Sequence, residues 1–314
     1  MSSYQVVFED DFAYASGQEL LATGRWAPGT AHWDSNLRCN DYGPSSYAYR
    51  AADVRTITDS AGRQLVALDY TYHNPPLDSV VSSNGEVTKG RFYKTSGLLR
   101  AVYRGDSSCA DTGFRYGIFE VRCKVPDTDG LQAAFWLWNA HGCGATDVDR
   151  RPGDIWEIDA FETFRNGNER VFFSTIQPNA FTDHKSVSTL LDFPRGQSPA
   201  TAFHTYTLEW TPTRLVYYVD GRITMIRRAT RRNPNGTGAP DTELNLLLSA
   251  HYQWDCKKNY HCDTLADRTT PNDQRCPQPN DPYLIDYVRV YRPKSTAPNG
   301  SWPKLRRQPA HRRE

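Results

Sequence analysis

The sequence predicts an all-β protein built as a sandwich of antiparallel sheets. Many short segments alternate apolar and polar residues, which is the period of a strand with one buried face. Turn-forming residues, including 21 glycines and 20 prolines, separate these segments, and helical periodicity is rare. With 314 residues the chain can bury a substantial core, and aromatic residues at 12% suit strands.

Composition excludes several classes of function. A net charge of +1 gives no sign of nucleic acid or an anionic membrane as a partner. No run of 18 apolar residues is present, so we expect no membrane span. Met1–Tyr4 shows no signal sequence, so the chain either starts after a removed signal or is not exported by that route.

The seven cysteines match no zinc-binding spacing and are interpreted as up to three disulfides and one remaining thiol. Cys256 and Cys262 share a loop rich in Pro and Asp, and they could pair with each other or with Cys276.

The first half of the chain provides four expected strands. Residues 6–12 form an opening strand that ends in acids, and residues 64–70 and 93–100 form two more. Residues 31–49 and 73–91 are expected as loops at the rim. Residues 116–126 alternate regularly between apolar and polar side chains, and a proline ends this strand.

The second half continues the pattern. Residues 131–139 form a strand on which Trp136 and Trp138 share one face. Further strands are expected at residues 171–177, in a hairpin over residues 203–221, and at residues 243–254 and 283–291.

Three acids stand close together in the segment from Trp156 to Glu162. Its composition favours a strand, on which Glu157 and Asp159 share one face. Strict alternation would turn Glu162 away from them. One extra residue, a β-bulge at Ala160–Phe161, returns Glu162 to the acidic face.

This arrangement suggests glycoside hydrolysis. Glu157 and Glu162 would be about four strand steps apart, ~13 Å between Cα atoms, and their carboxyls could approach to roughly 5–6 Å, near the separation in retaining glycosidases. Crowding should raise at least one carboxyl pKa. The alternative is a solvated acidic edge strand, which the flanking aromatic residues Trp156, Phe161 and Phe164 disfavour.

The pattern Glu157-x-Asp159-x-x-Glu162 resembles the active-site strand of glycoside hydrolase family 16. Residues 116–126, 134–137, 203–221 and 285–291 resemble other phrases of that family. The resemblance covers residues 5–292 as one catalytic domain and leaves residues 293–314 as a disordered tail or linker. It implies a β-jelly-roll of two curved antiparallel sheets with an open substrate groove on the concave face.

The resemblance also implies an endo-acting, retaining β-glycoside hydrolase. In that scheme Glu157 is the nucleophile, Glu162 is the acid and base, and Asp159 hydrogen-bonds Glu157. The protein would act as a secreted or periplasmic monomer on a polysaccharide, without a catalytic cofactor. Family members carry a structural calcium ion, for which Asp11 and Asp286 are the candidate ligands here.

Candidate substrate-binding residues lie around the acids. Trp136 corresponds to a tryptophan that lines the floor of the family's groove, and Trp138, His251, Trp254 and Arg165 are further candidates. For each, packing or solvation is the alternative. His204 is interpreted as structural, because it is far from the acids in sequence.

Three segments bear on the substrate class. Departures from glucanase phrases at residues 132–133, 177–179 and 249–252 shift the expectation toward a marine galactan such as agar, porphyran or carrageenan. An endo-β-1,3-glucanase (laminarinase) is the alternative on the same scaffold. A transglycosylase and a non-catalytic lectin remain as other classes.

Overall fold

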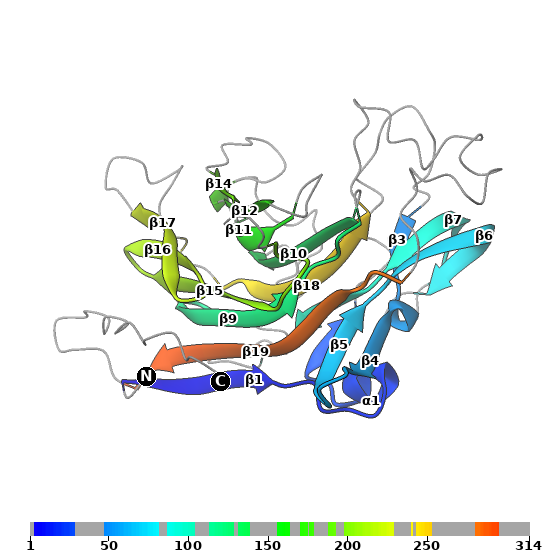
Figure 1. The fold of residues 1–314 in the computed structure, drawn as a ribbon, viewed down its shortest axis with the longest axis horizontal. Coiled ribbons are helices and arrows are strands. Elements are labelled where there is room, and N and C mark those ends of the chain that lie inside the picture. The colour runs from blue at the N-terminus through cyan, green and yellow to red at the C-terminus, as the bar shows by residue number, and fades with distance from the viewer. Residues whose placement is uncertain are drawn as a thin grey trace.

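The protein is described here from a computed structural model (Figure 1). It describes the residues in the ranges 3–28, 47–81, 87–103, 113–128, 131–138, 156–163, 170–174, 176–178, 188–192, 198–228, 240, 243–252 and 280–294. In these residues nearly all regular structure is β-strand, as the sequence predicted. None of the described helices is long and apolar enough to cross a membrane.

Two eight-stranded sheets dominate the described part of the chain. We call the first the outer sheet. Its strands follow the order β17-β16-β15-β9-β19-β5-β4, and β1 pairs with β19. The bounds are β1 Tyr4–Asp10, β4 Val54–Thr58, β5 Gln64–Leu68, β9 Gly117–Lys124, β15 His204–Thr211, β16 Arg214–Val219, β17 Arg222–Arg228 and β19 Tyr283–Pro293.

The second sheet, here the acid-bearing sheet, follows the order β14-β12-β11-β10-β18-β8-β2, and β13 pairs with β11. The bounds are β2 Trp26–Pro28, β8 Leu98–Ala101, β10 Leu131–Trp138, β11 Trp156–Glu162, β12 Arg170–Ser174, β13 Ile176–Pro178, β14 Ser188–Asp192 and β18 Asn245–Tyr252. Figure 1 shows both sheets curving in the same sense, with β10, β11 and β18 on the inner side of the curve.

A third sheet of three strands lies beside the sandwich, at the right of Figure 1. It contains β3 (Tyr47–Tyr49), β6 (Tyr70–Val81) and β7 (Val87–Ser96), in the order β3-β7-β6. Residues 73–91 were expected to be a loop, and this expectation was wrong over most of their length. Among the described residues, the helical elements are α1 (Gly17–Ala22) and the 3-10 helix η2 (Ala51–Asp53).

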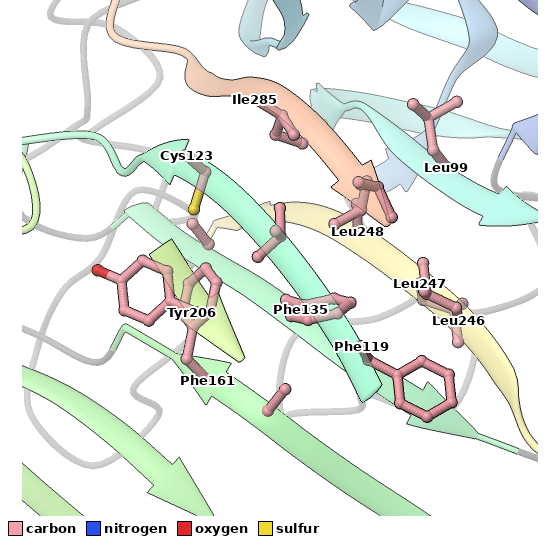
Figure 2. Packing of buried hydrophobic residues seen from close by; sticks show 14 of the residues in the cluster. Leu99, Phe119, Cys123, Phe135, Phe161, Tyr206, Leu246, Leu247, Leu248 and Ile285 are labelled. Carbon is pink, nitrogen blue, oxygen red and sulfur yellow. The ribbon is translucent and has the colours of Figure 1, made fainter. Parts of the chain in front are cut away.

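The core lies between the two large sheets (Figure 2). Phe119 and Cys123 of β9 and Tyr206 of β15 come from the outer sheet, and Phe135 of β10 and Phe161 of β11 come from the acid-bearing sheet. All five side chains are fully buried. The rings of Phe161 and Tyr206 have centroids 4.2 Å apart, so strand β11 is fixed to the opposite sheet.

One cysteine, Cys123, lies among the described residues. Cys123 is a free thiol, buried in the core. The other six cysteines, including Cys256, Cys262 and Cys276, lie outside the described residues. The expected disulfides therefore stay a prediction.

Candidate active site

Strand β11 carries the β-bulge that the sequence predicted. In its pairing with β10, Asp159 lies opposite Trp136 and Phe161 lies opposite Phe135, so Ala160 is the extra residue. Ala160 and Phe161 are both buried in the core. Consecutive core-facing side chains at these two positions return the next residue, Glu162, to the face that carries Glu157 and Asp159. We call this side of the sheet the acidic face.

The neighbouring strand β10 sets the spacing of the acids. Glu157 lies opposite Trp138, and Glu162 lies opposite Ala134. These β10 residues are four strand steps apart, ~13 Å between Cα atoms. The bulge therefore absorbs the extra residue of β11 and preserves a spacing that two inclined glutamate side chains can close.

Two tryptophans line the acidic face next to the acids. The rings of Trp136 and Trp138 are stacked, with centroids 5.8 Å apart and an angle of 22° between the planes. Trp136 is half-buried, and its Nε1 donates a hydrogen bond of 3.2 Å to Oγ of Ser249 on β18. A partly exposed indole held in this way can stack on the apolar face of a sugar ring.

The three acids differ in exposure and in protonation. Asp159 is buried, whereas Glu157 and Glu162 are half-buried. Burial raises the pKa of Glu157 to about 7, although a hydrogen bond between its side chain and that of Asp159 opposes the shift. Burial and the negative charge of Glu157 raise the pKa of Glu162 to about 8. At neutral pH, Glu162 therefore holds its proton more firmly than Glu157 does.

Gln132 contacts Glu162 directly, which the sequence did not predict. Its Nε2 donates a hydrogen bond of 2.9 Å to Oε1 of Glu162. Gln132 is two residues before Ala134, the cross-strand partner of Glu162, so it is the diagonal neighbour of that acid. A long polar side chain on the face of Trp136 and Trp138 was the available signal, but the diagonal contact depends on the register of β11.

His251 lies one strand further along the same face. It is opposite Gln132 in the pairing of β10 with β18, and its Nδ1 is hydrogen-bonded to Oη of Tyr49 at 3.2 Å. Burial and the positive charge of Lys94 lower the pKa of His251 to about 4, so this imidazole is neutral near pH 7. Trp254 and Arg165, the remaining substrate candidates, lie outside the described residues.

His204 belongs to the outer sheet and does not join the acids. It is buried on β15, and its Nδ1 lies 2.7 Å from Oδ2 of Asp220. Asp220 also accepts a hydrogen bond of 2.9 Å from the backbone of Thr205. This pair joins the two ends of a hairpin, in agreement with the structural role expected for His204.

The described residues give no support for calcium binding at Asp11 and Asp286, which therefore stays a prediction. The carboxylate of Asp286 forms an ion pair with Arg122, and Nη1 of Arg63 lies 3.8 Å away. Asp11 is exposed at the end of β1. Among the described residues, no group of three or more His, Cys, Asp or Glu side chains could hold a metal ion. Two guanidinium groups, those of Arg122 and Arg63, lie beside the carboxylate of Asp286.

Comparisons with known proteins agree with the family resemblance found in the sequence. The model of the family described as "Glycosyl hydrolases family 16" matches residues 80–267. The chain is 28% identical over 190 residues to a beta-glucanase of Bacillus subtilis (strain 168), covering 55% of this chain and 69% of that protein. It is 26% identical over 175 residues to the probable glycosidase CRR1 of Saccharomyces cerevisiae, covering 55% of this chain but only 35% of that protein.

A solved structure shows the same fold over almost the whole chain. It is the laminarinase catalytic domain from Thermotoga maritima MSB8, with a TM-score of 0.64 and 16% sequence identity, and the match covers 93% of this chain and 100% of that one. The names of these relatives give no support to the expected galactan substrate. The glucanase alternative is consistent with them.

Proposed function

Because the chain belongs to glycosyl hydrolase family 16, we propose that it is an endo-acting, retaining β-glycoside hydrolase whose substrate is a β-linked glucan. The main support is the bulge at Ala160, which leaves Glu157 and Glu162 on one face at a four-step spacing. The names of the glucanase relatives support a glucan, with β-1,3 linkages as the first candidate.

The proposed reaction is a double displacement. Glu157 attacks the anomeric carbon with its carboxylate, while Glu162 donates its proton to the oxygen of the departing sugar. The covalent glycosyl–enzyme intermediate is then hydrolysed. In this second step Glu162, now ionised, accepts a proton from the attacking water, and Glu157 is released as a carboxylate.

The other described residues of the acidic face support these two steps. Asp159 hydrogen-bonds Glu157 and opposes the rise in its pKa, which favours the ionised nucleophile. The half-buried Trp136, whose ring stacks on that of the buried Trp138, lies next to the acids, where a sugar near the scissile bond would lie.

The test replaces each glutamate by its amide. Glu157→Gln and Glu162→Gln should each lower the release of reducing ends by at least about a hundredfold, because nucleophile and acid contributions are this large. Glu9→Gln, an exposed glutamate of β1, is the matched control and should stay at the wild-type rate. Near-normal turnover in either active-site variant would refute the role given to that residue.

Substrate class is tested with laminarin, lichenan, agarose, porphyran and κ-carrageenan in parallel. We expect reducing ends from laminarin or lichenan, and NMR of the first products should show the β-anomer, since the mechanism retains configuration. Binding without release of reducing ends would indicate a lectin. Products that grow longer when an oligosaccharide is added would indicate a transglycosylase.

A further inference from the structure

The amide of Gln132 contacts one particular oxygen of Glu162. Its Nε2 lies 2.9 Å from Oε1, and an amide nitrogen can only donate a hydrogen bond. Oε1 must therefore accept, whether Glu162 is protonated or ionised. In a protonated acid the carbonyl oxygen is a better acceptor than the hydroxyl oxygen, so this hydrogen bond favours the hydrogen on Oε2.

We propose that Gln132 is a positioning residue that keeps the transferable proton of Glu162 on Oε2. The inference rests on the proposed role of Glu162 as the acid. A carboxyl group that rotates freely can present either oxygen, and only one orientation aims the proton at the departing oxygen. By holding Oε1, Gln132 selects that orientation before substrate binds.

The backbone around Gln132 and Glu162 is held firmly enough for this task. Oη of the buried Tyr70 donates a hydrogen bond of 2.5 Å to the carbonyl of Gln132. Thr163, which follows Glu162 and is also buried, accepts a 2.8 Å hydrogen bond from the amide of Ala133 on its Oγ1. Its own amide donates one of 3.0 Å to the carbonyl of Ala133. Both side chains therefore project from fixed points.

The same hydrogen bond affects the acidity of Glu162 in a known direction. A donor favours the ionised carboxylate, and Gln132 opposes the rise in the pKa of Glu162 caused by burial and by Glu157. Removing the donor should therefore raise that pKa further. Removing Gln132 should thus have two effects that can be measured separately: the proton of Glu162 loses its orientation, and the pKa of Glu162 rises. A residue with a purely structural role would not produce both.

The test compares two leaving groups in Gln132→Leu and in Gln132→Met, which keeps the length of the side chain. With the polysaccharide, which needs protonation of its leaving oxygen, kcat/KM should fall by about tenfold to a hundredfold. With a dinitrophenyl β-glycoside of the same sugar, whose leaving group needs no proton, kcat/KM should change by less than about threefold. The alkaline limb of the polysaccharide pH profile should move to higher pH.

Gln64→Leu, at an exposed glutamine of the outer sheet, is the matched control and should change neither substrate. Equal losses on both substrates with an unmoved alkaline limb, or no loss at all, would overturn the role of Gln132. Glu162→Gln measured with the same two substrates separates the two hypotheses. If that variant keeps its activity on the polysaccharide, the proposed function itself fails, whatever Gln132 does.

Discussion

At the scale of single residues, Glu157 and Glu162 have opposite requirements. The proposed nucleophile must be ionised and the proposed acid must be protonated, although both are partly buried on the same face. The negative charge of Glu157 helps to keep the proton on Glu162, and the Asp159 hydrogen bond helps to keep Glu157 ionised. One group of three carboxyls can therefore supply both protonation states near neutral pH.

The pH dependence of activity follows from the pKa values of Glu157 and Glu162. As pH rises, kcat/KM should increase while Glu157 ionises, with a pKa of about 7, and then decrease while Glu162 loses its proton, with a pKa of about 8. We expect a narrow bell between these values, measured as initial rates on polysaccharide. A profile that stays flat from pH 6 to 9 would contradict the assignment.

The same carboxyls should affect the stability of the fold. Because the pKa of Glu162 is higher in the folded protein than in the unfolded chain, the folded state binds more protons in the window above the normal value of 4.5. Stability contributed by this group is therefore lost as pH rises through that window.

Glu162→Gln should consequently be more stable than the wild type at pH 8, on the order of 1–2 kcal/mol in the free energy of unfolding, and close to it at pH 5. Urea denaturation at the two pH values measures this difference. Glu9→Gln, at an exposed glutamate of β1, is measured in parallel as the matched control. A variant that is less stable than the wild type at pH 8 would show that the ionised Glu162 carboxylate does not destabilise the fold.

At the scale of an element, β11 has two features that can be tested separately. These are the bulge at Ala160 and the spacing of Glu157 and Glu162 that the bulge preserves. On β10 the partners of the two glutamates, Trp138 and Ala134, are an even number of steps apart. A regular strand between Glu157 and Glu162 therefore needs one residue fewer than the sequence has.

Deletion of Ala160 should remove the bulge, keep all three acids on the acidic face, and retain activity within about tenfold of the wild type. Deletion of Ile158 shortens the strand equally, but it turns Asp159 into the core and should prevent stable folding. Reducing-end assays and thermal unfolding compare the two. Loss of activity in a well-folded Ala160 deletion would mean that the bulge itself, and not the spacing, is required.

At the scale of the whole molecule, alternation in the sequence predicted the two-sheet sandwich and most of its strands. It missed most of β6 and β7, where Pro75 and Pro76 indicated a loop. The structure places these prolines in an edge strand, between Tyr72 and Leu77, where the register shifts. An edge position and an irregular ladder are the conditions under which a strand tolerates proline.

The candidate site was predictable only where the contacts are local in sequence. The two tryptophans and the pair Glu157 and Asp159 lie on short segments whose faces follow from a period of two, and one inserted residue in the same segment brings Glu162 to that face. The contact of Gln132 with Glu162 and the ion pair of Arg122 with Asp286 join residues of separate strands. Such contacts depend on how the strands are ordered and aligned, which one sequence does not specify.

The free thiol of Cys123 can show whether the two large sheets stay packed against each other. It lies on β9 among core side chains of both sheets, and burial raises its pKa far above the usual range. An alkylating reagent needs the thiolate, so the folded protein should leave this sulfur unlabelled for as long as the sheets stay together. Peptide mass mapping after timed labelling would therefore follow their separation, and full labelling within minutes in native buffer would contradict a closed interior.

The rate at which Cys123 is labelled would therefore measure how often the two large sheets separate. Polysaccharide bound across the acid-bearing sheet should lower this labelling rate, because a ligand that prefers the closed form suppresses opening in proportion to its occupancy. Labelling of Cys123, in the core between the sheets, could thus report polysaccharide binding on the acidic face, without any turnover.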